Sequence, residues 1–535
     1  MSITRTDDRT TLYRWAVWLL LVASLGAMLA RIASVRAHTG ETPMLSANDR
    51  SRWGTIRALV EDGTYVIDRL VSIKHPETGR RYWKSIDMVR HRGPDGKEHY
   101  FSSKPPLLPT LLAGEYWIIR NVFGATLGDQ PFLVMRLMLV ISNVLPLLLF
   151  FILLWRLIER MTSDHLTLVY TMAAATWGTF LTTFAVTINN HLVAAIAVLL
   201  TVVLTVSIWF GERSWWYFAG AGLFSAFAAA NELPALSFLA CIGMGLMWKS
   251  PRQTLLAFLP GVLLVAAGFF GTNYIAHGTI VPAYLHRGDG PMVTTVSRDL
   301  DEALDQRELV DRVRDAMKES GIELSDQALV LVYQPGERWG IWDRVGHKRF
   351  ALVAEGKLIE IRHWDNWYDY RGSYWISDRQ GVDRGEPCRW VYAFHVLVGH
   401  RGVFSLTPIW LLSVAGAYLL LRQRRTGWTP FAAMVILLTI VCLGFYIARP
   451  RIDRNYGGVC CGFRWMFWFI PLWLLCLVPA AERLLRSRTG RLIALLLLLV
   501  SVFSATYAAS DPWSHPWLFD FGTYVGWWNY TAGSS

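Results

Sequence analysis

Long runs of apolar residues recur along most of the chain, and they constrain the fold more than any other feature. Two examples are Leu255–Tyr274 and Leu492–Tyr507, which are close to the length that an α-helix needs to cross about 30 Å of hydrocarbon. Only 17% of the residues are charged, whereas soluble proteins average about 25%. The mean hydropathy is +0.30. The sequence therefore predicts an all-α polytopic membrane protein.

Eleven segments have the composition of membrane-spanning helices. The first, around Trp15–Ala30, follows a basic segment but precedes no small-residue cleavage site, so we expect an uncleaved anchor and not a removed signal peptide. The predicted spans lie near residues 14–35, 131–155, 166–187, 190–210, 215–230, 233–248, 254–275, 403–421, 428–448, 465–481 and 491–508. An odd number of spans puts the two termini on opposite sides of the membrane.

The basic residues of the short loops predict the orientation. Five short loops on one side hold twelve Lys and Arg against three acids, whereas 187–190 and 231–234, on the other side, hold no base. Because basic short loops stay in the cytoplasm, the N-terminus is predicted inside and the C-terminus outside. The basic loops are 156–165, 211–214, 249–253, 422–427 and 483–491.

This topology divides the chain into six predicted regions. They are the cytoplasmic tail and first span (1–36), a first outer loop (37–130), spans 2–7 (131–275), an outer α/β insert (276–402), spans 8–11 (403–508) and an outer aromatic tail (509–535). We expect the first outer loop to hold two interfacial helices around a hairpin. Ser46 precedes an amphipathic helix over Arg50–Glu61, the turn Arg92–Gly96 joins two strands, and an apolar helix opens after Lys104.

The net charge of +11 does not indicate a nucleic-acid partner. Residues 285–395 carry sixteen Lys and Arg against twenty Asp and Glu, and most of the basic excess lies in the inner loops. One group departs from the positive-inside trend, because Arg449, Arg451, Arg454 and Arg464 all lie on the predicted outer side. This group indicates an anionic ligand, although Arg449 and Arg451 could instead extend toward lipid phosphates.

Two outer residues stand out as candidates for chemistry. Asp49, at the start of a surface helix, could accept a proton from a nucleophile; the alternative is a helix cap. Lys104 could bind a phosphate, or extend to the membrane interface.

Further polar residues gather at the outer mouths of spans. Asn189, Asn190 and His191 lie between spans 3 and 4, and Glu232 lies between spans 5 and 6. Such groups are costly near hydrocarbon, so their position on one side predicts a shared cavity, with helix capping as the alternative for the two asparagines. His400 and Arg401 precede span 8, and no histidine has the spacing of a zinc site.

The insert and the cysteines leave alternatives open. Aromatic residues alternate with Asp, Asn and Arg over Ile361–Trp375, a mixture that suits stacking on sugar rings but also suits an interfacial belt. An outer Cys388 could pair with Cys460 or Cys461 in an oxidising compartment.

These features, taken in order, resemble the GT-C superfamily of glycosyltransferases. They are an uncleaved anchor, Asp49 before a surface helix, Lys104-Pro-Pro, and an outer stretch from Arg454 through Tyr456 to Arg464. The branch of protein O-mannosyltransferases and aminoarabinose transferases is the most similar. The resemblance implies transfer of a sugar, with inversion, from a polyprenyl-phosphate donor to a glycan, lipid or protein acceptor. It also implies an outer, periplasmic site in a bacterial cytoplasmic (inner) membrane.

The resemblance also assigns roles to residues. Asp49 matches the first acid of the family's Asp-Glu pair, but Arg50 replaces the Glu, and Asn189 or Asn190 stands where some members have a second Asp. These departures leave the use of a divalent cation, Mg or Mn, open. The matching lysine implies that Lys104 contacts the donor phosphate, together with Arg454 or Arg464. These two arginines and Tyr456 lie in the loop that would close over the phosphate.

Two other classes of function remain open from the sequence. A transporter would use the same outer cavity, but it needs polar residues that continue to the inner face. A catalytically inactive scaffold that binds lipid or carbohydrate would fit the missing acids. The insert over 285–395 has no counterpart in the resemblance.

Overall fold

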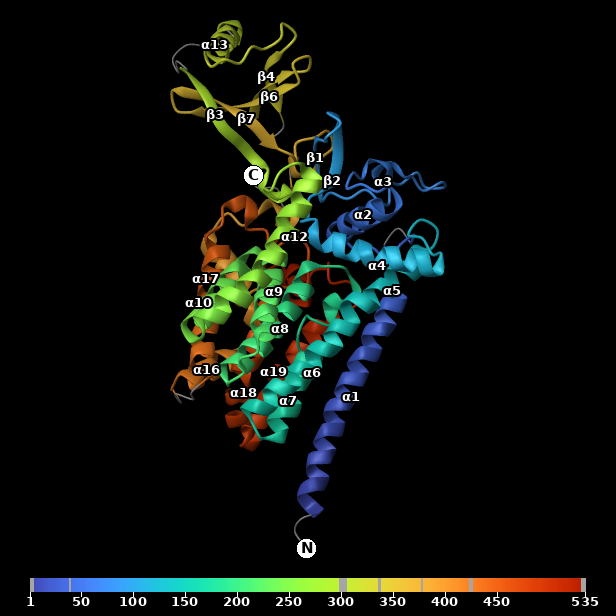
Figure 1. Ribbon diagram of the computed structural model, residues 1–535, viewed down its shortest axis with the longest axis vertical. Coiled ribbons are helices and arrows are strands. Elements are labelled where there is room, and N and C mark those ends of the chain that lie inside the picture. Colours follow the sequence, from blue (N-terminus) through green and yellow to red (C-terminus); the bar gives the residue numbers. More distant parts are fainter. Residues whose placement is uncertain are drawn as a thin grey trace.

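The computed structural model describes residues 4–37, 40–297, 306–334, 338–376, 379–422 and 427–530. A bundle of long helices forms one end of the molecule, and short helices and two small sheets gather at the other end (Figure 1). The first helix, α1 (Thr4–Ser34), runs along the side of the bundle. The fold is therefore a helical body with its other elements on one side.

Seven helical segments in the described part of the chain are long and apolar enough to cross a membrane. They are Thr11–Ser34, Pro131–Met161, Asn190–Trp209, Pro251–His277, Thr429–Ala448, Arg464–Leu485 and Arg488–Tyr507. Two shorter apolar helices cover Leu233–Lys249 and Trp410–Arg422. The predicted class, a helical multi-pass membrane protein with a small sheet insert, is confirmed.

The helical body is built from the following elements. They are α5 (Pro131–Leu139), the π-turn η1 (Val140–Val144), α6 (Leu145–Met161), α7 (His165–Trp177), η2 (Thr183–Val186), α8 (Asn190–Trp209), α9 (Trp215–Asn231), η3 (Leu233–Ala235), α10 (Leu236–Lys249), α11 (Pro251–Gln253), η4 (Thr254–Phe258), α12 (Leu259–His277), α15 (Val403–Leu406), α16 (Trp410–Arg422), α17 (Thr429–Ala448), η8 (Arg451–Asp453), η9 (Arg464–Phe469), α18 (Ile470–Leu485) and α19 (Arg488–Tyr507).

One predicted span, 166–187, is wrong in its outer half. Helix α7 ends at Trp177, and the chain continues through turns and the short 3₁₀ helix η2. The threonines of this stretch explain the break, because their hydroxyls offer the backbone alternatives to the helical hydrogen bonds. The carbonyls that the break frees are used nearby: the Asn143 amide donates to those of Ala185 and Thr187, at 2.9 and 3.0 Å.

The segment 40–130 folds as two longer helices on either side of a hairpin, with one short helix between the first of them and the hairpin. Its elements are α2 (Ala47–Glu61), α3 (Asp68–Ser72), β1 (Met88–Arg92), β2 (Glu98–Ser102) and α4 (Leu107–Phe123). Ser46 caps α2, and its hydroxyl accepts from the amides of Asn48 and Asp49. Helix α2 is buried along most of its length, including Trp53 and Ile56, because α4 and β2 pack against it. It is thus a core element of the outer layer.

The insert is a five-stranded antiparallel sheet with one helix. The strand order is β3-β7-β6-β5-β4, and Leu309, Val313 and Met317 of the helix pack on the sheet. The elements are η5 (Ala283–Leu285), β3 (Arg287–Ser297), α13 (Gln306–Glu319), β4 (Leu329–Gln334), β5 (Arg338–Asp343), β6 (Lys348–Glu355), β7 (Leu358–Asn366), η6 (Tyr374–Ile376) and η7 (Gly381–Arg384).

The last outer elements are α14 (Arg389–Leu397) and α20 (Trp517–Tyr524). All six cysteines lie in described segments and are free thiols. The bridge considered for Cys388 is therefore not formed: Cys388 is exposed, whereas Cys460 and Cys461 are buried.

Candidate functional site

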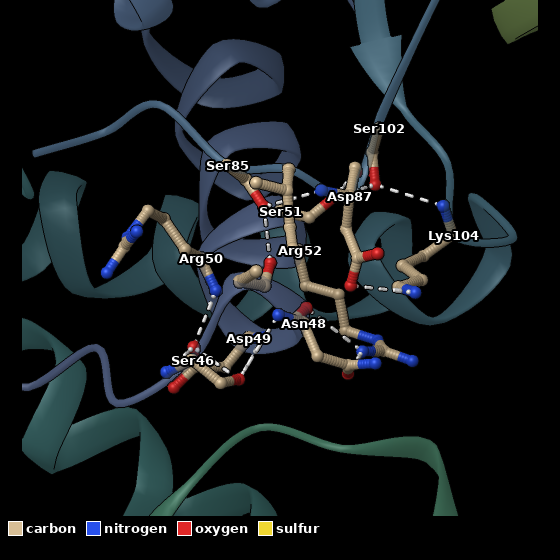
Figure 2. A network of polar contacts seen from close by, with 12 residues as sticks. Ser46, Asn48, Asp49, Arg50, Ser51, Arg52, Ser85, Asp87, Ser102 and Lys104 are labelled. Carbon is tan, nitrogen blue, oxygen red and sulfur yellow. Dashed lines mark hydrogen bonds and ion pairs between the residues drawn. The ribbon is translucent and has the colours of Figure 1, made fainter. Parts of the chain in front are cut away.

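An ion pair at the base of the hairpin forms the centre of the candidate site. Asp87 lies directly before β1, and Lys104 lies just after β2. Because Met88 pairs with Ser102 in the hairpin, the two charged residues come together, and Lys104 Nζ lies 2.9 Å from Asp87 Oδ2 (Figure 2). The Lys104 side chain is 21% exposed and that of Asp87 12%, so the pair is largely shielded from solvent.

Two arginines add positive charge to this pair. Arg52 of α2 reaches Asn190 Oδ1 at 2.6 Å and also binds the carbonyl of Asn48 at 3.1 Å. Both Arg52 and Arg464 act electrostatically on Asp87 and on Lys104. Three cations therefore lie around one carboxylate, an arrangement suited to an additional anion.

The pKa shifts of the central pair reflect this crowding. Burial raises the pKa of the Asp87 carboxyl, but Lys104, Arg464 and Arg52 outweigh that effect and hold the pKa below its ordinary value. Burial lowers the pKa of the Lys104 amine, and Asp87 offsets only part of this effect. Asp87 is therefore held as a carboxylate at neutral pH.

Asp49 is buried at the start of α2, and it is held by several hydrogen bonds. Its carboxylate accepts from the amides of Leu45 (3.0 Å) and Ser46 (2.9 Å) and from the hydroxyl of Thr187 (2.9 Å). Burial is the main influence on its pKa, which is raised. Asp49 and Ser46 together form a capping box. This is the helix-cap alternative that the sequence left open for Asp49. Its catalytic role stays a prediction.

Arg50 points away from the central pair (Figure 2). Its Nη1 donates to the carbonyl of Lys84 at 3.2 Å. The residue that replaces the family's Glu therefore does not join the Asp87–Lys104 pair.

The predicted polar cluster at the outer mouths does join the site. Asn190 Nδ2 donates to Glu232 Oε1 at 2.6 Å, and His191 Nδ1 contacts the same oxygen of Glu232. Arg464 Nη1 contacts His191 Nε2 at 2.5 Å. Asn189 instead caps α8, where its Oδ1 accepts from the Leu192 amide at 2.8 Å. Arg52, Asn190, Glu232, His191 and Arg464 thus form one continuous network.

Four other predicted residues belong to a second cluster. Tyr456 donates to Glu386 Oε1 at 2.9 Å, His400 contacts the Tyr530 hydroxyl at 2.7 Å, and Arg401 contacts His515 at 2.9 Å. Arg454 donates to the carbonyl of Pro387 at 3.1 Å. Of the two arginines proposed for the phosphate, therefore, Arg464 lies with Lys104 and Arg454 does not.

This second cluster contains one group that could hold a metal ion. Ligand atoms of Glu386, His395 and His400 lie within 4.8 Å of one another, and all three residues are buried. However, His400 Nδ1 faces the Arg401 guanidinium at 3.2 Å, whereas a metal-bound histidine normally donates its other nitrogen to an acceptor. The two imidazoles are also stacked, 4.0 Å apart. These contacts favour a hydrogen-bonded network over a metal centre.

An apolar cavity of about 210 Å³ lies in the helical body. It lies between α4, α6, α8 and α9, and its lining along α8 extends from Asn189 to Leu200, about 16 Å at 1.5 Å per residue. Leu108 and Leu112 line it from α4, which begins three residues after Lys104. Along the chain, the lining therefore comes close to the charged cluster at two points, after Lys104 and next to Asn190.

Sequence reasoning missed Asp87 and Arg52. A usable signal was present, because the Arg92–Gly96 turn predicts a hairpin whose register brings Asp87 close to Lys104. Strand β1 begins at Met88, so Asp87 lies just outside it. Arg52 carried no signal, since its distant partner, Asn190, lies 138 positions further along the chain.

Comparisons with known proteins found two solved structures with a similar course of the chain. One is an oligosaccharyltransferase from Archaeoglobus fulgidus in complex with Zn and sulfate (11% identity, TM-score 0.40, 93% of this chain and 53% of that one). The other is the S. cerevisiae protein O-mannosyltransferase Pmt1-Pmt2 complex bound to the sugar donor (11% identity, TM-score 0.46, 98% and 93%). This chain spans about half the length of the oligosaccharyltransferase.

No family model and no curated protein matches the sequence. The TM-scores of both structures lie below 0.5, so the likeness is one of chain course alone.

Proposed function

We propose that this chain is a membrane glycosyltransferase of the GT-C type, which transfers a sugar from a polyprenyl-phosphate donor to an acceptor hydroxyl on the outer face. One observation carries the proposal: Arg52, Lys104 and Arg464 act on one carboxylate, Asp87, and an apolar cavity begins close along the chain, at Leu108 and Asn189. A lipid phosphate needs both parts, a set of cations for the head group and an apolar channel for the chain. A soluble phosphate would need only the cations.

The phosphate would bind in competition with Asp87. At present Asp87 is the counter-ion of Lys104, and a phosphate oxygen that approaches Lys104 shares that positive charge. The bond between the anomeric carbon and the phosphate oxygen breaks during transfer, and the phosphate leaves with the electron pair. Cations that are already in place stabilise this developing charge.

A carboxylate would take the proton from the acceptor. The acceptor oxygen forms the new bond to the anomeric carbon from the side opposite the phosphate, so the configuration inverts, and its proton passes to the base. Asp87 suits this role, because its carboxylate is paired with Lys104 through one oxygen, Oδ2. Phosphate binding draws Lys104 away and raises the proton affinity of Asp87. Asp49 is the alternative base, and it would have to release one of its present donors.

The proposed setting is a bacterial cytoplasmic membrane with the N-terminus inside. Support comes from the basic short loops and from the position of the hairpin, α2, α4 and the insert at one end of the bundle (Figure 1). The acceptor, whether glycan, lipid or protein, and the need for a divalent cation both await experiment.

The test replaces Lys104 by Met in the full chain, purified in lipid nanodiscs. Binding of undecaprenyl phosphate is measured, together with transfer of label from polyprenyl-phosphate mannose and polyprenyl-phosphate aminoarabinose. We expect Lys104→Met to weaken phosphate binding about tenfold or more, since a charge-assisted contact contributes about 1.5–3 kcal/mol. Lys97→Met, which removes an exposed lysine of the same hairpin, is the matched control. Equal binding by both variants would contradict the proposal.

A further inference from the structure

The insert contacts the free edge of β1 along its whole length. Trp375 Nε1 donates to the carbonyl of Ile86 at 2.8 Å, and the amide of Arg90 donates to the carbonyl of Trp367 at 2.8 Å. Between them, the Tyr370 hydroxyl contacts the carbonyl of Met88 at 3.5 Å. Strand β2 pairs with the opposite edge. One segment of the insert, 367–375, therefore binds alternate residues on both sides of Asp87.

This segment is the aromatic stretch for which the sequence suggested sugar stacking. Tyr368 and Tyr370 are only 3% and 6% exposed, and Tyr368 packs with Val89 and Phe101 of the hairpin. Their rings are therefore covered by the hairpin. The sugar-stacking interpretation is wrong for these two residues, because they form the contact between the insert and the outer loop.

A column of four stacked rings completes this contact. Phe101 stacks on His91 at 4.2 Å, His91 stacks on Trp367 at 4.0 Å, and Trp367 stacks on His286 at 3.6 Å between ring centroids. The first two rings come from the hairpin, and the last two come from the insert and the segment that leads into it. Trp367 is thus the ring that joins the two parts.

His91 of this column and its neighbour His277 are packed in a way that disfavours protonation of both rings. His91 Nε2 lies 3.0 Å from Nδ1 of His277, at the end of α12, so two imidazolium ions would face each other. Nε2 of His277 and Nε2 of His286 are buried without a partner. Few charged groups face these histidines. Asp365 Oδ1 lies 2.5 Å from His286 Nδ1, and His99 acts on His91 only electrostatically.

We propose that the insert is a positioning element of the transferase site: Trp367 holds β1, and with it the Asp87–Lys104 pair, while His91 and His277 are neutral. This inference rests on the proposed function for its effect on catalysis. The docking of the insert on the hairpin, through the contacts described above, is a property of the structure alone. Trp367 touches neither reacting group, and it acts through the backbone of β1.

The direction of the pH dependence follows from burial. Burial is the largest influence on the pKa of His91, and it lowers that pKa below the ordinary value. The undocked histidine therefore takes up a proton at a pH where the docked one does not. A histidine whose pKa is lowered in the docked state favours undocking as the pH falls. Below about pH 6.5, each histidine of this kind shifts the equilibrium between docked and undocked insert toward the undocked state by up to about tenfold per pH unit. Docking is fully favoured above that pH.

Hydrogen exchange of the full chain in nanodiscs tests the docking without any substrate. The amide of Arg90 is the reporter, since it donates to the carbonyl of Trp367 across the contact, whereas the amide of Trp367 donates to the carbonyl of His286 within the insert. At pH 7.5 we expect the Arg90 amide to be protected, and at pH 5.0, after correction for the intrinsic exchange rate, we expect its protection to fall at least tenfold. Unchanged protection at pH 5.0 would overturn the pH dependence.

Four variants separate positioning from simple support. Trp367→Ala is expected to expose the Arg90 amide and to lower transfer about 10- to 100-fold, the cost of a small misplacement of catalytic groups. Trp367→Phe keeps a ring in the column and should restore most of both signals. Trp342→Ala, which removes an exposed ring of the same insert, is the matched control. His91→Phe keeps the stack without a titrating group, so its transfer should lose less activity at pH 5.0 than the wild type.

The outcomes distinguish the two proposals. If Trp367→Ala loses protection but keeps full transfer, the insert docks without positioning the site, and this inference fails while the proposed function stands. If the wild type transfers no sugar, the proposed function fails, and the exchange data still decide whether the insert docks through Trp367. If Trp367→Ala keeps the protection of Arg90, the inferred contact is wrong.

Discussion

Replacing Asp87 by Asn tests the centre of the proposed mechanism. The substitution keeps the size of the side chain but removes the negative charge that now neutralises Lys104 at 2.9 Å. At that separation and an effective dielectric constant of about 20, the attraction between unit charges is about 6 kcal/mol. A phosphate that binds Lys104 has to replace part of this attraction. If it replaces only a quarter, the variant should bind phosphate about tenfold more tightly, since 1.4 kcal/mol is a factor of ten.

Transfer should change in the opposite direction. If Asp87 is the base, its loss should slow the chemical step by about 10²- to 10⁴-fold, so tighter binding accompanies slower transfer. The variant should also be less stable, by about 3 kcal/mol, the lower end of the cost of leaving a buried charge unpaired, because Lys104 keeps 21% of its side-chain surface exposed.

The assay measures undecaprenyl phosphate binding and single-turnover transfer on the same nanodisc sample. Asp95→Asn, at the tip of the same hairpin, is the control, and thermal unfolding confirms that each variant is folded. Single-turnover transfer within twofold of the wild type would remove Asp87 from the mechanism. Weaker phosphate binding would refute the electrostatic reasoning.

Four further outcomes are expected. Arg52→Gln should weaken phosphate binding at least fivefold, whereas Arg50→Gln on the same helix should leave it unchanged, because only Arg52 faces the Asp87 network; equal effects in a binding assay would argue against the assigned site. Asp49→Asn should lower the thermal stability by about 1–2 kcal/mol through loss of a cap, and it should abolish transfer only if Asp49, and not Asp87, is the base. Ala197→Phe should fill the apolar cavity and weaken binding of undecaprenyl phosphate but not of a short-chain analogue; a parallel loss for both would indicate a folding defect. Chelation by EDTA should lower transfer less than twofold, since the protein supplies its own cations, and a larger loss that Mg or Mn restores would assign the cation role that the sequence left open.

The fold class could be read from the sequence because burial in a membrane is a local property. A run of twenty apolar residues has one stable arrangement in hydrocarbon, a helix, and seven such helices are present in the described chain. The capped start of α2 and the hairpin turn are also local signals. The 166–187 span failed because composition does not reveal where threonine side chains and a polar neighbour such as Asn143 interrupt a helix.

The candidate site was only partly readable. Lys104, Arg464, Asn190, His191 and Glu232 were identified because polar residues in apolar surroundings stand out individually. Which of them act together depends on contacts between segments far apart in the chain, as for Arg464 and His191, 273 positions apart. The same holds for the separation of Arg454 and Tyr456 into another cluster.

The sequence by itself thus determined a polytopic helical protein, its predicted orientation and a set of outer polar residues. Only the tertiary structure decided that Arg52 joins Lys104 and Arg464 around the Asp87 carboxylate, that Asp49 belongs to a helix cap, and that the insert holds β1. The physical reason is that hydrophobicity and turn propensity act over a few residues, whereas ion pairs and ring stacking depend on distances that only the packed chain defines.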